Sequence, residues 1–145
     1  MPKKLLVIGA HSADFVWRAA GAIALVTSQG GSATVIALSY GERGESGELW
    51  KEPEQTIENV KSIRHEQAAV AAGIVGATFR CLDLGDYPLT ITDAALQELV
   101  GIFQDIQPDI VITHTPADPF NPDHPVACQA VQNARLLASG AGVAS

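Results

Sequence analysis

Four short apolar runs alternate along the chain with longer stretches in which apolar residues recur at helical spacing. Short runs that are apolar throughout are typical of strands buried on both faces of a parallel sheet. The predicted strands cover residues 3–9, 33–38, 78–82 and 110–113. The predicted helices run from 14 to about 29, from 56 to a glycine at 76, from 92 or 93 to about 107, and from near 125 to 140. This alternation predicts an α/β, three-layer, Rossmann-like fold with a mainly parallel sheet and helices on both faces.

Three polar segments each follow one of the predicted strands. They cover residues 11–15, 39–55 and 114–124. The carboxyl ends of parallel strands line the ligand crevice of an open α/β sheet, so we expect these segments to converge at one edge. No internal repeat or linker interrupts the chain, and its 145 residues are interpreted as a single domain, 1–145.

Composition and charge narrow the classes of partner. The formal net charge is −7 and the basic residues do not cluster, which argues against nucleic acid. No apolar run is long enough to cross a bilayer, and the run after Met1 is too short for a secretory signal. We therefore expect no membrane partner and a cytoplasmic location. Cys81 and Cys128 lack metal-binding or redox spacing and are interpreted as buried thiols.

The turn after the first strand contains two candidate metal ligands. His11 and Asp14 lie three residues apart where a strand hands over to a helix, so both side chains can point to one site. Catalytic zinc usually has three protein ligands, so a further ligand is needed. His124 is the best candidate, because it lies at the start of the last predicted helix, after the fourth strand. Asp123 would orient a ligating imidazole. The alternative is that His11 caps the strand end and His124 lies at the surface.

Other polar residues near these strands leave several interpretations open. The first turn has neither the glycine pattern of a dinucleotide site nor a P-loop, which excludes both classes. His114 and Asp118, in the loop after the fourth strand, are candidate ligands or substrate contacts. His65 lies within a predicted helix and is interpreted as an exposed or packing residue.

The segment 39–55 combines glycines with carboxylates, an arginine and an aromatic residue. Such a composition suits an active-site lid, in which arginine binds a carboxylate and a shielded glutamate acts as general acid or base. The alternative is a solvated surface loop, which is the usual fate of a charged run. The length of the segment and its position after a strand favour a function.

These residues resemble the LmbE-like or PIG-L family of zinc-dependent N-acetylglucosaminyl deacetylases. The matching positions are Ala10, His11, Asp14, Arg64, Glu66 and residues 122–124. The resemblance covers nearly the whole chain and implies a Zn²⁺ cofactor held by His11, Asp14 and His124. It also implies a homo-oligomer. Family members usually extend well past this length, so the chain either lacks a C-terminal part or ends differently.

Two positions depart from the family pattern. The general base of the deacetylases corresponds to Ala13, and the histidine that polarises their carbonyl substrate corresponds to Asn121. An alanine cannot take a proton from water, so the deacetylase mechanism loses its base while the metal ligands are retained. A divergent branch, the 4-oxalomesaconate hydratases, is more similar. It shares the turn Ala-His-x-Ala-Asp-Phe and the loop Ser-Tyr-Gly-Glu-Arg-Gly-Glu-Ser.

The resemblance to this branch implies a zinc-dependent hydratase of gallate and protocatechuate breakdown. It would add water across the C=C bond of 4-oxalomesaconate, a small polycarboxylate, to give 4-carboxy-4-hydroxy-2-oxoadipate. A loop glutamate would be the base, and we favour Glu48 over Glu45 because Leu49 and Trp50 would shield it. The candidate substrate-binding residues are Arg43, Tyr40 and Asn121, with Lys51 or Arg64 as further cations. The alternatives are a deacetylase of N-acetyl sugars whose base lies elsewhere, and a non-catalytic member that binds metal and ligand.

Overall fold

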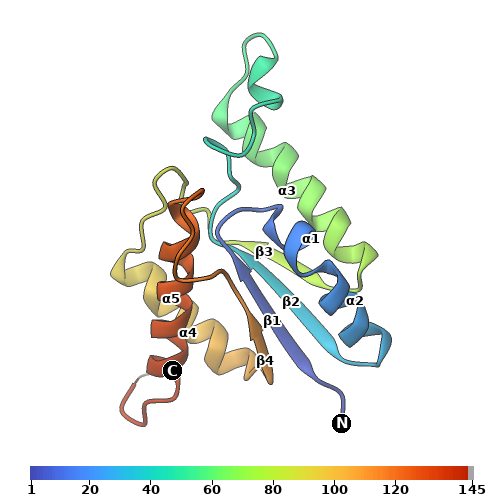
Figure 1. The fold of residues 1–145 in the computed structure, drawn as a ribbon, viewed down its shortest axis with the longest axis vertical. Coiled ribbons are helices and arrows are strands. Elements are labelled where there is room, and N and C mark those ends of the chain that lie inside the picture. The colour runs from blue at the N-terminus through green and yellow to red at the C-terminus, as the bar shows by residue number, and fades with distance from the viewer. Residues whose placement is uncertain (144–145) are drawn as a thin grey trace.

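The computed structural model describes residues 1–143 and places a four-stranded sheet between two layers of helices (Figure 1). The strands are β1 (Lys4–Gly9), β2 (Ser32–Ala37), β3 (Thr78–Cys81) and β4 (Ile110–Ile112). They lie in the order β3-β2-β1-β4, and each neighbouring pair is parallel. The helices are α1 (Asp14–Arg18), α2 (Ala20–Ser28), the short 3₁₀ helix η1 (Leu49–Lys51), α3 (Ile57–Ile74), α4 (Asp93–Ile106) and α5 (Asp123–Ala138). The predicted α/β fold is confirmed.

Strand β1 lies inside the sheet and is buried on both faces. Leu6 and Ile8 pack into the core beneath α4 and α5, whereas Leu5 and Val7 pack into the core beneath α1, α2 and α3 (Figure 1). These four side chains are at most 3% exposed, as the uninterrupted apolar run predicts. Both helix layers therefore pack against β1, and this packing fixes the position at which the following turn begins.

Two of the helices, α3 and α4, begin at threonine capping residues. The Thr56 and Thr92 side chains accept hydrogen bonds from the backbone N–H groups of Asn59 and Ala95, which satisfies donors in the first turns of α3 and α4. The single helix predicted over 14–29 is wrong, because the backbone breaks at Ala19 (φ −134°, ψ −5°) and separates α1 from α2. The break lets α1 hold its first turn over the end of the sheet while α2 packs along the strands. An alanine-rich sequence carries no signal for it.

The three polar segments converge at the carboxyl ends of the strands, as predicted. They follow β1, β2 and β4, and residues from all three line one cavity. Within residues 1–143, no helix combines the length and the apolar character needed to span a bilayer.

Candidate metal centre and active-site cavity

His11 is held rigidly in the turn after β1. Its side chain is 1% exposed, and its Nε2 lies 2.8 Å from Oδ2 of Asp123. The Asp123 carboxylate also accepts hydrogen bonds from the backbone N–H groups of Tyr87 and Leu89, and with His11 these donors outweigh the effect of burial and lower its pKa. An ionised carboxylate only accepts, so Nε2 carries a hydrogen, and Nδ1 is the ring nitrogen that a metal ion would bind by displacing its proton. Among the described residues, this buried Nδ1 has no hydrogen-bond partner.

His124 shows the same arrangement from the first turn of α5. Its Nδ1 lies 2.8 Å from Oδ2 of Asp118, while its Nε2 is buried and finds no hydrogen-bond partner within residues 1–143. Burial lowers the pKa of His124, which keeps the ring neutral and the Nε2 lone pair free. The ring of His114 stacks on His124 with centroids 3.8 Å apart. His114 thus packs against His124, one of the candidate metal ligands. Its own Nε2 accepts a hydrogen bond from the backbone N–H of Ala10 at 3.0 Å.

Asp14 lies between Nδ1 of His11 and Nε2 of His124. Its Oδ2 accepts a hydrogen bond from the backbone N–H of His11 and lies 3.5 Å from His11 Nδ1, while its Oδ1 lies 3.5 Å from His124 Nε2. Burial alone would raise the pKa of Asp14, but His11 and His114 outweigh it and hold the pKa far below its usual range. The first turn of α1 therefore presents a carboxylate that stays ionised.

These three side chains fit a divalent metal ion. One ligand atom from each of His11, Asp14 and His124 lies within 4.8 Å of the others. Two unpartnered imidazole nitrogens and one carboxylate form the donor set of many catalytic zinc sites, and a carboxylate behind each ligating histidine is the usual orienting partner. The predicted ligand set is thus brought together, and Asp123 contacts His11 as proposed from the sequence.

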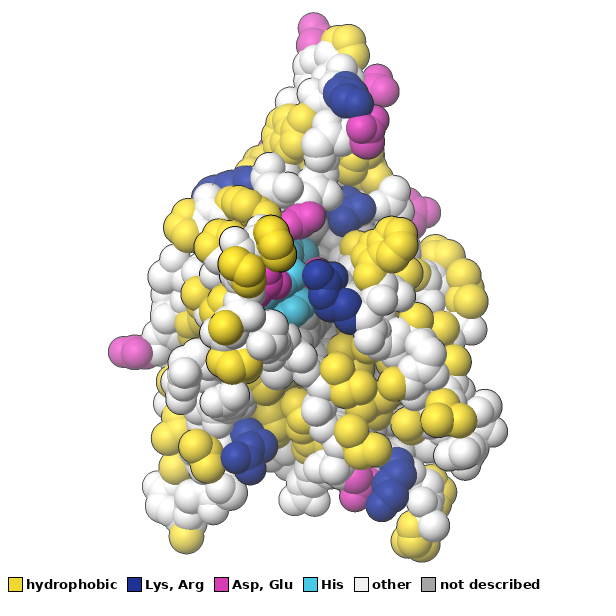
Figure 2. All heavy atoms as spheres, viewed as in Figure 1, with side chains coloured by type: hydrophobic (Ala, Val, Ile, Leu, Met, Phe, Trp, Pro, Cys, Tyr) yellow, Lys and Arg dark blue, Asp and Glu magenta, His cyan; other side chains and the backbone are white. Residues whose placement is uncertain are grey.

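The metal donors lie in a cavity of about 470 Å³ at the carboxyl ends of the strands. Figure 2 shows the cyan histidines recessed between magenta carboxylates and dark blue basic side chains. The cavity is lined by His11, Ala13, Asp14, Trp17, Arg18, Glu45, Arg64, Asp118, Phe120, Asn121 and His124. Ala13 contributes only a methyl group next to the metal donors, so this part of the wall has no acid–base group.

Glu45 is the loop carboxylate that reaches the cavity. Its Oε1 accepts hydrogen bonds from the Tyr87 hydroxyl (3.0 Å) and the Asn121 side-chain amide (2.9 Å), and lies 3.9 Å from Nδ1 of His11. Burial and the nearby Glu45 raise the pKa of Tyr87 to about 12, so the phenol remains a hydrogen-bond donor at neutral pH. Glu45 is therefore fixed at one oxygen by two neutral donors.

The backbone of the loop is fixed in place by contacts with the segment before α4. Asp86 accepts hydrogen bonds from the backbone N–H groups of Arg43 and Gly44. Tyr87 packs so closely on Gly44 that a Cβ there would lie 2.1 Å from its ring. These contacts fix the backbone next to Glu45 and so set the direction in which its side chain points.

Three residues that the sequence favoured, Glu48, Arg43 and Tyr40, do not line the cavity in the part of the chain that the structure describes. The side chain of Glu48 is 87% exposed and pairs with Lys51 at 2.6 Å. The expected shielding by Leu49 and Trp50 is wrong, because the Trp50 indole instead donates to the carbonyl of Glu42. Arg43 is exposed, and its backbone N–H rather than its guanidinium makes the contact with Asp86.

Tyr40 points away from the cavity. Its hydroxyl lies 3.0 Å from Nδ1 of the exposed His65 in α3, and neither residue lines the cavity. Asn121, in contrast, is in the cavity wall, where it contacts Glu45.

Sequence reasoning missed Arg18, Trp17 and Tyr87. Arg18 follows Asp14 by four residues in α1, a spacing that places both on one helix face and was a usable signal. Tyr87 gave none, because its contact with Glu45 depends on how two distant loops pack. Asp118, considered as a ligand or substrate contact, lies in the cavity wall and holds Nδ1 of His124.

Comparisons with known proteins relate the chain to one enzyme family. The model of the family described as GlcNAc-PI de-N-acetylase (PIG-L) matches residues 6–135. A 4-oxalmesaconate hydratase from Pseudomonas putida is 47% identical over 140 residues, which are 97% of this chain and 54% of that protein. A probable N-acetyl-alpha-D-glucosaminyl L-malate deacetylase 2 from Bacillus cereus is 28% identical over 137 residues, covering 92% of this chain and 61% of that protein.

Solved structures show the same relationship. The structure of GalB, the 4-carboxy-2-hydroxymuconate hydratase from Pseudomonas putida, matches 97% of this chain and 59% of its own with a TM-score of 0.96 and 47% identity. The N,N'-diacetylchitobiose deacetylase from Pyrococcus horikoshii matches 97% of this chain and 52% of its own with a TM-score of 0.86 and 21% identity, which shows a shared fold. The chain thus spans little more than half the length of the relatives it matches.

Proposed function

Because the chain belongs to the PIG-L family, whose model covers residues 6–135, we propose that it is a zinc-dependent hydratase of an unsaturated polycarboxylate. The substrate we propose is 4-oxalomesaconate, which would be converted to 4-carboxy-4-hydroxy-2-oxoadipate. The relatives named as hydratases, at 47% identity, support this choice. A cytoplasmic location and a homo-oligomeric state stay predictions.

One observation carries the choice of hydration over amide hydrolysis. Ala13 stands beside the metal donors where the deacetylases resembled by this chain place their base, and Glu45 supplies the acid–base group from the loop instead. The other two carboxylates in the cavity wall have structural tasks, because Asp14 belongs to the ligand set and Asp118 holds His124. The proton chemistry is therefore assigned to Glu45.

The residues of the chain can be given roles in water addition. Zinc held by His11, Asp14 and His124 would supply Lewis acidity toward an oxygen conjugated with the alkene. Tyr87 and Asn121 hold one oxygen of Glu45, which leaves the other to accept a proton from water as its oxygen bonds to an alkene carbon. The protonated Glu45 then returns this proton to the neighbouring carbon, so that H and OH end on adjacent carbons. Arg18 and Arg64 line the same cavity and would bind the carboxylates of the substrate.

The proposal is tested by assaying zinc-loaded full chain with 4-oxalomesaconate and following the loss of the conjugated double bond. We expect turnover that disappears in His11→Ala and after metal removal, and that returns when zinc is added back. Full activity after complete metal removal would overturn the metal-dependent mechanism.

The retained ligand set and the family model favour deacetylation as the second candidate. In this case Glu45 would serve as the base for amide hydrolysis, and the same preparation would release acetate from an N-acetylglucosamine conjugate. Zinc-loaded protein that binds a polycarboxylate and turns over neither compound would instead identify a non-catalytic binding protein.

A further inference from the structure

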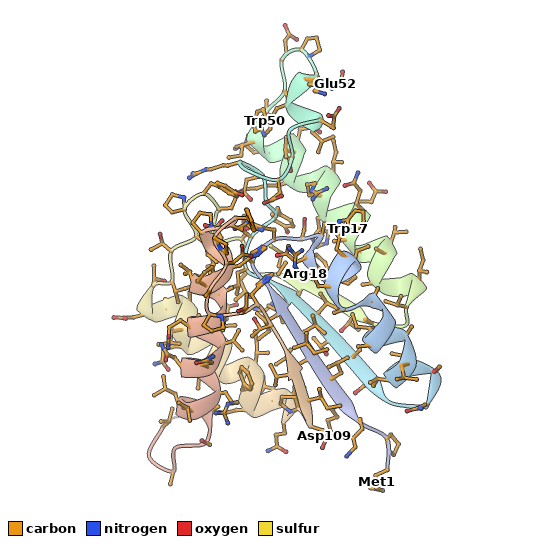
Figure 3. All side chains as sticks on the ribbon, in the orientation of Figure 1. Met1, Trp17, Arg18, Trp50, Glu52 and Asp109 are labelled. Atoms are coloured by element: carbon orange, nitrogen blue, oxygen red, sulfur yellow. The ribbon has the colours of Figure 1, made fainter. Side chains whose placement is uncertain are left out.

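Arg18 projects from α1 into the mouth of the cavity. It lies four residues after Asp14, on the same face of the helix, and its side chain is 52% exposed. Figure 3 shows Arg18 near the carboxyl end of the sheet, with Trp17 beside it on the side of α3. Both residues line the cavity, so the last turn of α1 forms part of its rim.

The ion pair with Asp14 uses little of the hydrogen-bonding capacity of Arg18. Its Nη1 lies 3.5 Å from Oδ1 of Asp14, at the long limit for a hydrogen bond. A guanidinium has five N–H donors arranged to match a carboxylate, and a single contact of this length from a half-exposed arginine contributes little to stability. The position of Arg18 in the rim is therefore not explained by its contact with Asp14.

A second guanidinium faces the same cavity from α3. Arg64 is half-buried, its Nη1 donates to the side chain of Gln67, and its buried Nε has no hydrogen-bond partner among the described residues. A buried donor without a partner costs free energy unless a ligand or water satisfies it. Arg64 thus presents unused donors to whatever occupies the cavity.

The carboxylates in the wall leave these arginines available. Asp118 is bonded to His124, and Glu45 is bonded to Tyr87 and Asn121, so neither is paired with a guanidinium. The two arginines lie in a cavity with space for a small organic anion beside the ligand set. Planar guanidinium donors recognise carboxylates by paired, charge-assisted hydrogen bonds.

We propose that Arg18 and Arg64 form a two-point anion clamp, and that Arg18 determines the preference of the site for polycarboxylates over monocarboxylates. The inference rests on the proposed function and deepens it, because it names the residue that would read the number of carboxylates on the substrate. One carboxylate binds at Arg64 in the interior, and another binds at Arg18 at the rim. A compound with a single carboxylate engages only one of these points.

The test is a series of inert carboxylates titrated calorimetrically into zinc-loaded full chain at constant ionic strength. Acetate, succinate and tricarballylate carry one, two and three carboxylates and cannot be hydrated. We expect tricarballylate to bind at least about tenfold more tightly than acetate. Arg18→Gln should weaken tricarballylate binding by about tenfold and change acetate binding by less than about twofold.

Two further variants make the result specific. Arg18→Lys keeps the charge without the paired donors and should recover part of the lost affinity. Arg135→Gln removes an exposed arginine of α5 that lies outside the cavity, and should bind the series as the unmodified chain does. Zinc content and circular dichroism establish that each variant is folded and loaded before titration.

The outcomes separate this inference from the proposed function. Equal weakening of all three compounds, no weakening, or the same weakening in Arg135→Gln would overturn the clamp, even if the chain hydrates 4-oxalomesaconate. A selective loss in Arg18→Gln, in a chain that does not hydrate 4-oxalomesaconate, would support the clamp and overturn the hydratase. In an active chain, Arg18→Gln should raise KM for the tricarboxylate substrate much more than it lowers kcat.

Discussion

The two walls of the cavity are built in different ways. The metal wall consists of His11, Asp14 and His124, and the substrate wall consists of Glu45, Arg18 and Arg64. In the metal wall the side chains of His11 and His124 are 1% and 4% exposed, and each is oriented by a carboxylate. In the substrate wall the side chains of Glu45 and Arg18 are 38% and 52% exposed.

The difference follows from what each wall must do. Metal ligands have to be held in place before the ion arrives, because reorganising them would lower affinity. A substrate wall has to exchange water for substrate at every turnover, so its charged groups keep access to solvent. The following changes test whether the metal wall and the substrate wall can be altered independently.

The largest effect is expected from removing a ligand in the metal wall. His124→Ala takes away one of three donors, so metal affinity should fall by more than the roughly 10–100-fold that loss of an orienting carboxylate costs. Measured after dialysis, zinc content should drop from stoichiometric to near zero, and the proposed hydration should be lost with it. His65→Ala, which removes an exposed histidine outside the cavity, is the matched control and should retain zinc. Full zinc occupancy in His124→Ala would show that the ion binds elsewhere.

The next effect concerns the substrate wall and separates two glutamates of the same loop. Glu45→Gln keeps the contacts with Tyr87 and Asn121 but removes the proton acceptor, so kcat should fall by roughly 10²–10⁴-fold. Glu48→Gln changes an exposed residue paired with Lys51 and should alter kcat by less than about twofold. Zinc content should stay unchanged in both variants. The reverse ranking of the two kcat values would return the role of base to Glu48.

The metal wall was predictable from the sequence, and the substrate wall was predictable only in outline. His11 and Asp14 follow the first predicted strand directly, and His124 lies at the start of the helix after the fourth, so the strand directions bring all three to one edge of the sheet. Glu45 and Glu48 have the same chemistry and lie three residues apart, and no local pattern distinguishes them.

Contacts from a distant segment decide between these two glutamates. Asp86 binds the backbone of the loop and Tyr87 packs on Gly44, which turns Glu45 inward. The same reason explains why Tyr40 and Arg43 were misplaced. Tertiary packing, which a single sequence does not show, sets the direction of side chains in a long loop.

A third pair of changes tests the carboxylates that orient the two histidines of the metal wall. Asp118→Asn and Asp123→Asn each remove the carboxylate behind a ligating histidine, and each should lower metal affinity by roughly 10–100-fold. The two should differ in stability. Asp123 also accepts two backbone N–H groups in the interior, so its replacement should lower the free energy of unfolding by about 1–3 kcal/mol.

Asp118 also accepts hydrogen bonds from two backbone N–H groups, those of Phe120 and Asn121, but in a loop at the edge of the cavity, so its replacement should lower the unfolding free energy by less than that of the buried Asp123. Urea denaturation of the metal-free variants measures the stability difference, and competition with a chromogenic chelator measures metal affinity. Equal stability of the two metal-free variants would contradict the structural distinction between the buried and the peripheral carboxylate.

The smallest effect is a pH dependence that belongs to the metal wall alone. In the metal-free protein burial lowers the pKa of His11, but Asp14 and Asp123 outweigh it and raise the pKa from 6.5 to about 9. The folded state therefore holds this proton more tightly than the unfolded chain. The resulting stabilisation is fully present below pH 6.5 and is lost as the pH rises to about 9.

Scanning calorimetry of the metal-free chain from pH 6.5 to 9 should show a Tm that falls more steeply than that of metal-free His11→Gln. Burial raises the pKa of Glu42, which also favours the folded state at lower pH, but this contribution is common to both proteins and cancels in the difference. Metal must displace the His11 proton, so metal affinity should rise by about tenfold per pH unit through the same window. Parallel Tm profiles would mean that His11 carries no extra proton, and the two walls would then differ in burial but not in charge.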